Sequence, residues 1–185
     1  GTAGPATISV NIAAVDDTPG IDTNAGLGLD EDGTKAITNS ELAASDDDNT
    51  DADLTYTVES APGDGALILD GSGTGSVNGG KDGESALGQN GTFQQSDIDS
   101  GKVLYVHDGA ESTSDSFDFS VSDGNSSTST TTFNFNITPK NDAPTASNDS
   151  VSVQSGQPKT FTVLGNDSDP EGDSLSLNGA GTPGN

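Results

Sequence analysis

The chain has no cysteine, no methionine and no tryptophan, and only 5 of its 185 residues are lysine or arginine. Without cysteine, no disulfide can hold its parts together. No apolar run approaches the roughly 18 residues of a membrane span, and no signal peptide is visible. Because 30 aspartates and glutamates set the net charge at −25, nucleic acid and anionic membranes are poor partners for this surface.

A low apolar content of 28%, combined with this net charge, is also typical of disordered chains. Apolar residues nevertheless alternate with polar ones in many short runs, and the acids cluster at turns where divalent cations could neutralise them. Disorder is therefore an alternative mainly for the metal-free chain, since metal binding and folding are coupled. Clustered carboxylates of weak calcium affinity are useful where calcium is millimolar, so we expect an extracellular or cell-surface location.

The alternation of apolar and polar residues predicts an all-β protein. Phe117, Phe119 and Val121 fall on one strand face, and residues 54–58 and 133–137 show the same pattern. Short strands of this kind predict a cadherin/immunoglobulin-like antiparallel β-sandwich in which each sheet has one solvated face. One helix-like stretch spans residues 39–44. The predicted strands are residues 7–14, 34–38, 54–58, 66–69, 103–106, 116–121, 130–137, 150–153, 159–163 and 174–177.

One strand pattern occurs twice. Residues 7–12 (TISVNI) lead to an acidic hinge ending at Pro19, and residues 132–137 (TFNFNI) lead to a similar hinge ending at Pro144, so both features recur 125 positions later. A strand followed by an acidic, proline-containing hinge at a fixed interval is expected at the joints of tandem β-modules. The pattern predicts three parts: the last strand and linker of a preceding repeat at 1–17, a complete repeat at 18–141, and the N-terminal part of a following module at 142–185.

Two acidic clusters, residues 46–53 (DDDNTDAD) and 166–173 (NDSDPEGD), each lie just before a predicted strand. Alternate carboxylates in a tight turn point to one centre, and calcium takes six to eight oxygen ligands. Neighbouring carboxylates repel one another by about 1 kcal/mol or more per pair, and the few lysines and arginines leave the counter-charge to come from solution. The alternative is that these acidic turns are solvated and serve only to keep the surface soluble.

Other motifs give no support to catalysis. The second acidic cluster begins like an EF-hand loop, but Asn178 occupies the position of the required glutamate and strands flank the loop. The Gly-rich insertion at 71–91 lacks the spacing of a phosphate loop and predicts a hairpin tip with tight turns at 78–79 and 90–91. His107 falls on the face of the 103–106 strand that carries its apolar residues, so we expect it to be packed. With no nucleophile elbow and no sign of a deep cleft, we expect no enzyme.

Residues 91–111 (GTFQQSDIDSGKVLYVHDGAE) and 115–124 (DSFDFSVSDG) carry a distinctive string of motifs: Asp-Ile, Tyr-x-His-Asp-Gly, Asp-x-Phe-x-Phe and Ser-Asp-Gly. This string resembles the cadherin-like repeat of chondroitin sulfate proteoglycans, which also occurs in very large bacterial surface adhesins. The resemblance covers about residues 18–144. Residues 141–177 are similar to the start of a further cadherin-like module, of the type found in bacterial repeats-in-toxin adhesins.

In such arrays calcium lies between modules, so the resemblance implies a Ca²⁺ site at each junction. The chain departs from the family pattern at three points: Asp108 and Glu111 are three residues apart rather than two, the linker lacks a second asparagine, and Ser155-Gly156 replaces acids of the following module. The resemblance and the acidic clusters together supply the candidate ligands. They are Glu31, Asp108, Glu111, Asn141, Asp142, Asp167, Asp169, Glu171 and Asp173 at the following junction, and Asp16, Asp17, Asp46, Asp48 and Asp53 at the preceding one.

These observations predict a calcium-rigidified structural or extender module of a large bacterial cell-surface adhesin, of the kind that supports cell adhesion and biofilm. Its partners would be the neighbouring repeats of the same chain. Two alternatives stay open. The repeat could itself be a calcium-dependent recognition module for a glycan or for a like module on another cell. The strand at 7–12 of one chain could also complete the 142–185 segment of the next chain, which would build a filament by strand addition.

Overall fold

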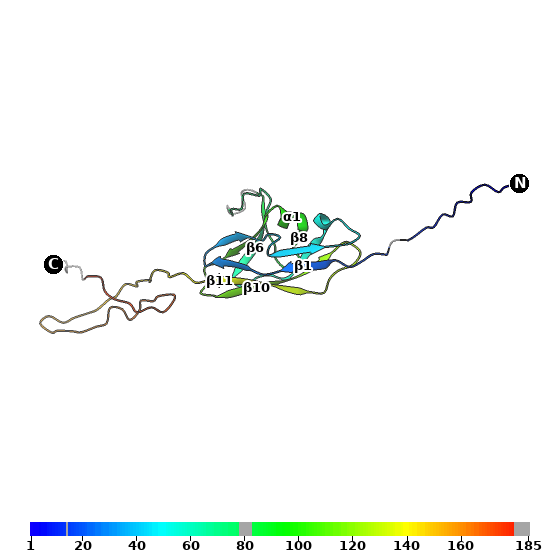
Figure 1. The fold of residues 1–185 in the computed structure, drawn as a ribbon. Helices are drawn as coiled ribbons and strands as arrows, with labels where there is room; N and C mark the ends of the chain where they lie inside the picture. The colour runs from blue at the N-terminus through cyan, green and yellow to red at the C-terminus, as the bar shows by residue number, and fades with distance from the viewer. Residues whose placement is uncertain (14, 78–82, 180–185) are drawn as a thin grey trace.

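A β-sandwich forms the centre of the molecule, and the two ends of the chain leave it in opposite directions (Figure 1). The computed structural model describes residues 1–13, 15–77 and 83–179. The elements are β1 (Gly20–Asn24), β2 (Leu27–Asp30), β3 (Thr34–Ala36), β4 (Leu42–Ser45), the 3-10 helix η1 (Asp51–Asp53), β5 (Thr55–Ser60), β6 (Gly65–Asp70), β7 (Glu84–Ala86), β8 (Thr92–Gln94), α1 (Gln95–Asp99), β9 (Val103–His107), β10 (Ser114–Ser122) and β11 (Thr131–Thr138).

The strands form a five-stranded sheet in the order β2-β11-β10-β5-β8, a four-stranded sheet in the order β3-β9-β6-β7, and a two-stranded pair of β1 and β4. All of these neighbours are antiparallel except β2 and β11, which run parallel with Asp30 opposite Thr138. The predicted antiparallel sandwich is therefore confirmed. The one parallel pair has a local consequence, because it brings the residues after β2 beside the residues after β11.

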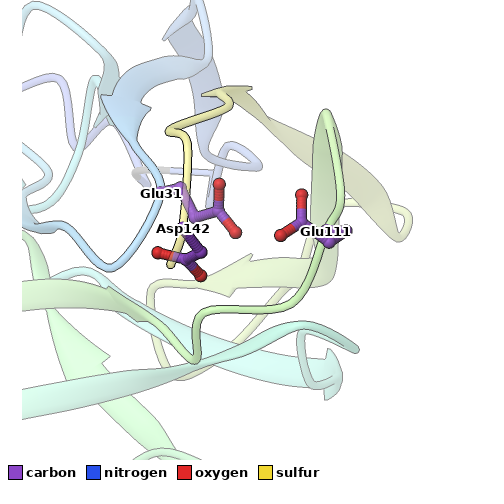
Figure 2. Close-up of side chains that lie close together, drawn as sticks. All are labelled: Glu31, Glu111 and Asp142. Atoms are coloured by element: carbon purple, nitrogen blue, oxygen red, sulfur yellow. The ribbon is translucent and has the colours of Figure 1, made fainter. Parts of the chain in front are cut away.

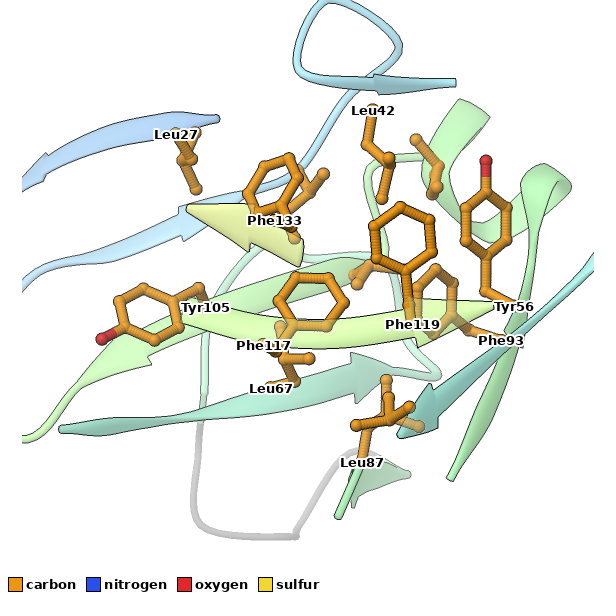
Figure 3. Packing of buried hydrophobic residues seen from close by; sticks show 14 of the residues in the cluster. Leu27, Leu42, Tyr56, Leu67, Leu87, Phe93, Tyr105, Phe117, Phe119 and Phe133 are labelled. Atoms are coloured by element: carbon orange, nitrogen blue, oxygen red, sulfur yellow. The ribbon is translucent and has the colours of Figure 1, made fainter. Parts of the chain in front are cut away.

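Aromatic side chains fill the space between the two sheets. Tyr105 of the four-stranded sheet stacks on Phe135 of the five-stranded sheet, with ring centroids 3.7 Å apart. At the other end of the core, Tyr56 stacks on Phe93 at 4.9 Å (Figure 3). The side chains that alternation placed on one face are buried in β5, β10 and β11 alike. The core therefore follows from the two-residue period of the sequence.

Six of the predicted strands are present, at the positions of β3, β5, β6, β9, β10 and β11. Five short strands, β1, β2, β4, β7 and β8, were not predicted, and neither was α1. These elements are three to five residues long, which is too short for a periodic pattern to be recognised. Helix α1 begins with a reciprocal capping pair, in which the Gln94 N–H donates to Asp97 Oδ2 at 2.9 Å.

The prediction of a helical stretch at 39–44 was wrong. A turn occupies residues 39–41, where the Thr38 N–H and hydroxyl donate to Glu41 Oε2 at 3.0 and 2.6 Å. Strand β4 follows, with Leu42 and Ala44 buried. Pairing with β1 provides β4 with ladder hydrogen bonds, and Leu42 and Ala44 join the hydrophobic core. These tertiary contacts override the helix propensity of Glu, Leu and Ala.

The strands predicted toward the two ends do not form among the described residues. Residues 7–13, 150–153, 159–163 and 174–177 are not in strands, and an isolated bridge between Thr145 and Ser168 is the pairing found in the C-terminal segment that the structure describes. Ile8 and Ile12 are 87% and 88% exposed. The physical reason is that a strand needs a hydrogen-bonding neighbour and a covered face, and these segments have neither.

The Gly-rich insertion at 71–91 begins directly after β6 and contains β7, which pairs antiparallel with β6. The predicted turn at 90–91 is confirmed, since Asn90 has a positive φ of 65° and the Gly91 N–H donates to the carbonyl of Gly88. The turn predicted at 78–79 lies outside the described residues. Asp70 is fully buried where the insertion begins, and its carboxylate accepts hydrogen bonds from Ser72, Gly73 and Gly75.

The aromatic core yields a first prediction. We expect Phe135→Ala to lower the free energy of unfolding by about 3–5 kcal/mol, because the substitution leaves a cavity against Tyr105 and Phe117. Phe161→Ala is the matched control, since Phe161 is 47% exposed and its truncation should cost less than about 0.5 kcal/mol. Urea denaturation of both variants measures the difference, and equal losses would contradict the assignment of the core.

Asp70 yields a second prediction. The Ser72 hydroxyl, aided by the N–H groups of Gly75, Ser72 and Gly73, holds the pKa of Asp70 at about 2, below its ordinary value of 3.8. A lowered carboxyl pKa stabilises the fold above the unfolded-state value, and this stability is lost as pH falls toward the folded-state value. Between pH 3.8 and about 2, the unfolding free energy of Asp70→Asn should therefore fall less steeply than that of the unaltered chain. Parallel slopes in urea titrations at these pH values would count against this role.

Candidate metal centre

Three acidic side chains from distant parts of the sequence meet at the end of the sandwich where the chain leaves β11. Glu31 follows β2, Glu111 lies in the loop between β9 and β10, and Asp142 lies four residues after β11 (Figure 2). One carboxylate oxygen of each lies within 4.8 Å of the others. Within residues 1–13, 15–77 and 83–179, this is the one group of three or more acidic, histidine or cysteine side chains that comes so close together.

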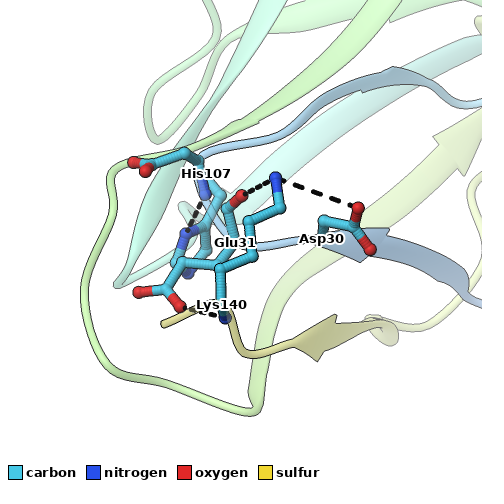
Figure 4. A network of polar contacts seen from close by, with 5 residues as sticks. Asp30, Glu31, His107 and Lys140 are labelled. Atoms are coloured by element: carbon cyan, nitrogen blue, oxygen red, sulfur yellow. Dashed lines mark hydrogen bonds and ion pairs between the residues drawn. The ribbon is translucent and has the colours of Figure 1, made fainter. Parts of the chain in front are cut away.

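The parallel pairing of β2 and β11 places Glu31 against the linker. The Glu31 N–H continues the ladder by donating to the carbonyl of Thr138 at 3.0 Å. The Lys140 N–H donates to Glu31 Oε2 at 2.8 Å, and Lys140 Nζ donates to the carbonyl of Glu31 at 3.0 Å (Figure 4). Lys140 Nζ also lies 3.8 Å from Asp30 Oδ2. The linker is thus attached to the residues after β2 through backbone and side chain together.

The second oxygen of Glu31 has no partner. Glu31 is only 1% exposed, and its Oε1 atom is buried without a hydrogen bond. Leaving a buried acceptor unsatisfied costs about 1–3 kcal/mol, and more when the group is charged. Because Glu111 and Asp142 lie beside it, the nearest side chains add further negative charge. A cation at this position would bind the free oxygen and neutralise the group.

Two acids of the C-terminal segment approach the same place. Partial desolvation, followed by the charges of Glu171, Glu31, Asp142 and Asp169, raises the pKa of Glu111 above its ordinary value. The Asp142 N–H donates to Glu171 Oε1 at 2.7 Å, which holds Glu171 against the linker. The accumulated charge of these carboxylates suits a hard divalent cation that takes oxygen ligands.

The remaining candidates at this end lie nearby but outside the group of three. Each takes part in a hydrogen bond within the loops or the C-terminal segment. Asp108 Oδ1 accepts from Ala110 N at 3.0 Å, Asp167 Oδ1 accepts from Ser147 N at 2.8 Å, Asn141 Nδ2 donates to the Asp142 carbonyl at 2.9 Å, and Asp173 N donates to Asp169 Oδ1 at 2.9 Å.

At the opposite end, the predicted acids lie near one another without three carboxylates converging among the described residues. The Asp17 N–H donates to Asp48 Oδ2 at 2.8 Å. Asp46 Oδ1 accepts from the N–H groups of Asp48 and Asn49, while its Oδ2 atom is buried without a partner. Asp17 and Asp46 line a common pocket, and Asp53 lies exposed in η1.

Sequence reasoning missed three residues that shape these ends. Lys140 attaches the linker to Glu31, and a lone lysine in a linker carries no signal for that role. Asn125 Nδ2 donates to Asp16 Oδ1 at 2.8 Å, and the Ser126 hydroxyl donates to the Asp17 carbonyl at 3.3 Å. The turn that places Asn125 and Ser126 follows the Ser-Asp-Gly motif, which could have indicated a tight turn but not its contact with the N-terminal hinge.

Comparison with known proteins gives two family matches. Residues 19–138 match the Cadherin-like family, which confirms the cadherin-like resemblance, and residues 141–185 match the family described as Bacterial Ig domain. In the part of the chain that the structure describes, no helix has the length and apolar character needed to cross a membrane.

Several similar proteins are extracellular matrix proteins, in agreement with the predicted extracellular location. Extracellular matrix organizing protein FRAS1 of Homo sapiens is 34% identical over 173 residues, which cover 91% of this chain and 4% of the relative. Extracellular matrix protein 3 of Lytechinus variegatus is 32% identical over 162 residues, covering 84% and 5%. FRAS1-related extracellular matrix protein 2 of Homo sapiens is 34% identical over 117 residues, covering 63% and 3%. The chain thus spans a small part of the length of these relatives.

The raised pKa of Glu111 predicts that Glu111→Gln stabilises the fold without calcium and destabilises it when calcium is bound. A carboxyl whose folded-state pKa is raised destabilises the fold as pH rises above the unfolded value of 4.5 through the folded value. In a chelator at pH 7, Glu111→Gln should therefore unfold at a higher temperature than the unaltered chain, and below pH 4.5 the two should unfold alike. With excess calcium at pH 7 the order should reverse, because the variant loses a ligand.

Glu59→Gln is the control for this experiment, since it removes an equal charge from β5, where Glu59 accepts a hydrogen bond from the Ser120 hydroxyl. It should show neither the gain in chelator nor the loss in calcium. Thermal unfolding followed by circular dichroism at the two pH values measures both effects. An identical response of the two variants would mean that the neighbouring carboxylates do not destabilise ionised Glu111.

Proposed function

The chain belongs to the cadherin-like family, and from this we propose that residues 18–141 form an extracellular structural module that calcium rigidifies at its junction with the segment that follows. The observation that carries the proposal is the unpartnered, buried Oε1 atom of Glu31, whose carboxylate lies close to those of Glu111 and Asp142. The extracellular matrix relatives favour a structural role over an enzymatic one.

Calcium would join three parts of the chain at this site. Glu31 and Glu111 belong to the sandwich, Asp142 belongs to the linker, and Asp169 and Glu171 belong to the segment beyond it. Three carboxylates offer at most six oxygens, whereas calcium takes six to eight, so the acids of the C-terminal segment would complete the shell. Asp108, Asn141, Asp167 and Asp173 would then support the loops that carry the ligands.

The mechanical consequence follows from charge. Without calcium, the carboxylates repel one another and the linker is held to the sandwich mainly by Lys140. A bound cation reverses the sign of this interaction and pulls the linker, Glu111 and the 167–173 loop toward one centre. The angle between successive modules would then be fixed, which is the property that an extender of an adhesive or matrix protein needs.

We further propose that both ends of the chain belong to neighbouring repeats. Residues 7–12 repeat the pattern of β11, and their apolar side chains are exposed, so they require the covering sheet of another module. The Bacterial Ig domain match at 141–185 supports a following module there and favours a large bacterial surface adhesin as the setting. Asp16, Asp17, Asp46, Asp48 and Asp53 would be the ligands that this repeat contributes to the preceding junction.

Calcium binding is directly testable. At a calcium concentration 100 times Kd, a single site should stabilise the fold by about 2.7 kcal/mol, which corresponds to a rise in Tm of roughly 10 °C for a module of this size. Glu31→Gln should abolish most of this rise, because a glutamine can still accept from Lys140 N but carries no charge. Isothermal titration of the chelator-treated chain, together with Tm measurements, gives both quantities.

Two controls make the calcium result specific. Glu59→Gln lowers the net negative charge by the same amount on β5 and should leave the calcium-induced Tm rise unchanged. Magnesium at equal concentration should stabilise less, because it demands a smaller and more rigid octahedral shell. If the unaltered chain binds no calcium and shows no Tm rise, the proposed function is wrong.

A further inference from the structure

The imidazole ring of His107 contacts both the loop that carries Glu31 and the loop that carries Glu111. His107 is the last residue of β9 and is 3% exposed, as its place on the apolar strand face predicted. Its ring lies beside Tyr105, with centroids 6.4 Å apart, and its backbone N–H donates to the carbonyl of Gly33 at 3.0 Å. Burial and packing therefore hold the ring in place independently of the hydrogen bonds at its two nitrogens.

The two ring nitrogens have different partners. Nδ1 accepts from the N–H of Asp32 at 3.4 Å and from the N–H of Gly109 at 3.2 Å, while Nε2 lies 3.1 Å from the Ser112 hydroxyl. Backbone N–H groups can only donate, so Nδ1 must be the unprotonated nitrogen of a neutral ring. The proton is then on Nε2, from which it can be donated to Ser112 Oγ.

The residues that the ring contacts are the sequence neighbours of the two glutamates. Asp32 follows Glu31, and Ser112 follows Glu111, so each glutamate is one residue away from a hydrogen bond to the same ring (Figure 4 shows the Glu31 side). The two loops also pack on each other, because a Cβ atom added to Gly109 would collide with Asp32 Oδ1. Gly109 has a positive φ of 85°, which allows its N–H to face the ring.

We propose that His107 is a positioning residue of the calcium site: it holds the loop of Glu31 and the loop of Glu111 at the separation that lets both carboxylates bind one cation. This inference rests on the proposed function. The hydrogen bonds of the ring go to Asp32, Gly109 and Ser112 and not to either carboxylate, so it acts through these residues. Groups that orient metal ligands in this way typically contribute 10-fold to 100-fold to metal affinity.

Two substitutions separate the hydrogen bonds from the packing. His107→Phe keeps a ring of similar size but leaves the Asp32 and Gly109 N–H groups without an acceptor. His107→Asn places an amide oxygen near the position of Nδ1 and retains that acceptor. We expect calcium affinity to fall at least about tenfold in the phenylalanine variant and to recover to within about threefold of the unaltered chain in the asparagine variant.

The measurement is isothermal calcium titration of the chelator-treated full chain, with Glu31→Gln used to identify the heat that belongs to this site. Tyr56→Phe is the matched control, because it removes one buried hydrogen bond, to Gln95, from another part of the core. It should lower Tm in chelator without changing the calcium Kd. A second readout needs no metal: amide hydrogen exchange at Asp32 and Gly109 in chelator should speed up in the phenylalanine variant and not in the asparagine variant.

The outcomes separate the two proposals. If the unaltered chain binds calcium and His107→Phe retains its Kd within twofold, the positioning role is wrong and the calcium site stands. If the asparagine and phenylalanine variants lose affinity equally and in proportion to their loss of Tm, His107 is only a packing residue. Absence of calcium binding in the unaltered chain overturns the proposed function and, with it, the positioning role.

Discussion

The parallel pairing of β2 with β11 is the constraint on which the functional end of this module depends. In a sheet whose other neighbours are antiparallel, it makes β2 and β11 finish at the same end of the sheet, with Asp30 opposite Thr138. Glu31 and the linker therefore begin side by side, and two hydrogen bonds from Lys140 fasten one to the other. The chain therefore leaves the sandwich beside the buried, unpartnered Oε1 atom of Glu31.

Burial and the surrounding charge are both unfavourable for an ionised Glu31 at that place. Burial of Glu31 removes it from water, which a carboxylate tolerates only when its oxygens are satisfied, and one of them is not. The approach of Glu111, Asp142, Asp169 and Glu171 makes the local field more negative still. Such an arrangement is unfavourable for a sandwich alone and becomes favourable when a divalent cation is shared among sandwich, linker and the following segment. Calcium would thus act as the crosslink that cysteine supplies in other extracellular modules.

The sequence predicted the interior of the fold far better than its edges. Phe117, Phe119, Phe133 and Phe135 alternate over long strands, and each is buried as alternation requires. Strands of three to five residues, such as β2 and β8, have too few positions to show a period. The composition of residues 39–44 favours a helix, whereas pairing with β1, which local sequence does not reveal, makes 42–45 a strand. Residues 7–13 show a clear strand period and yet form no strand. The period indicates which face would be buried, but a strand forms only where another part of the structure packs against that face.

The sequence by itself determined the fold class, the repeated module pattern and the excess of carboxylates that must be neutralised from solution, because these depend only on period, spacing and composition. Tertiary structure decided which of the many acids meet. Glu31, Glu111 and Asp142 come from three separate loops, and only strand register and the contacts of His107 and Lys140 bring those loops together. Asp46, which lies among several neighbouring acids, instead uses its Oδ1 atom to shape its own turn, where it accepts from the N–H groups of Asp48 and Asn49. Proximity along the chain favours local hydrogen bonds, whereas a shared cation site requires carboxylates that approach from different directions.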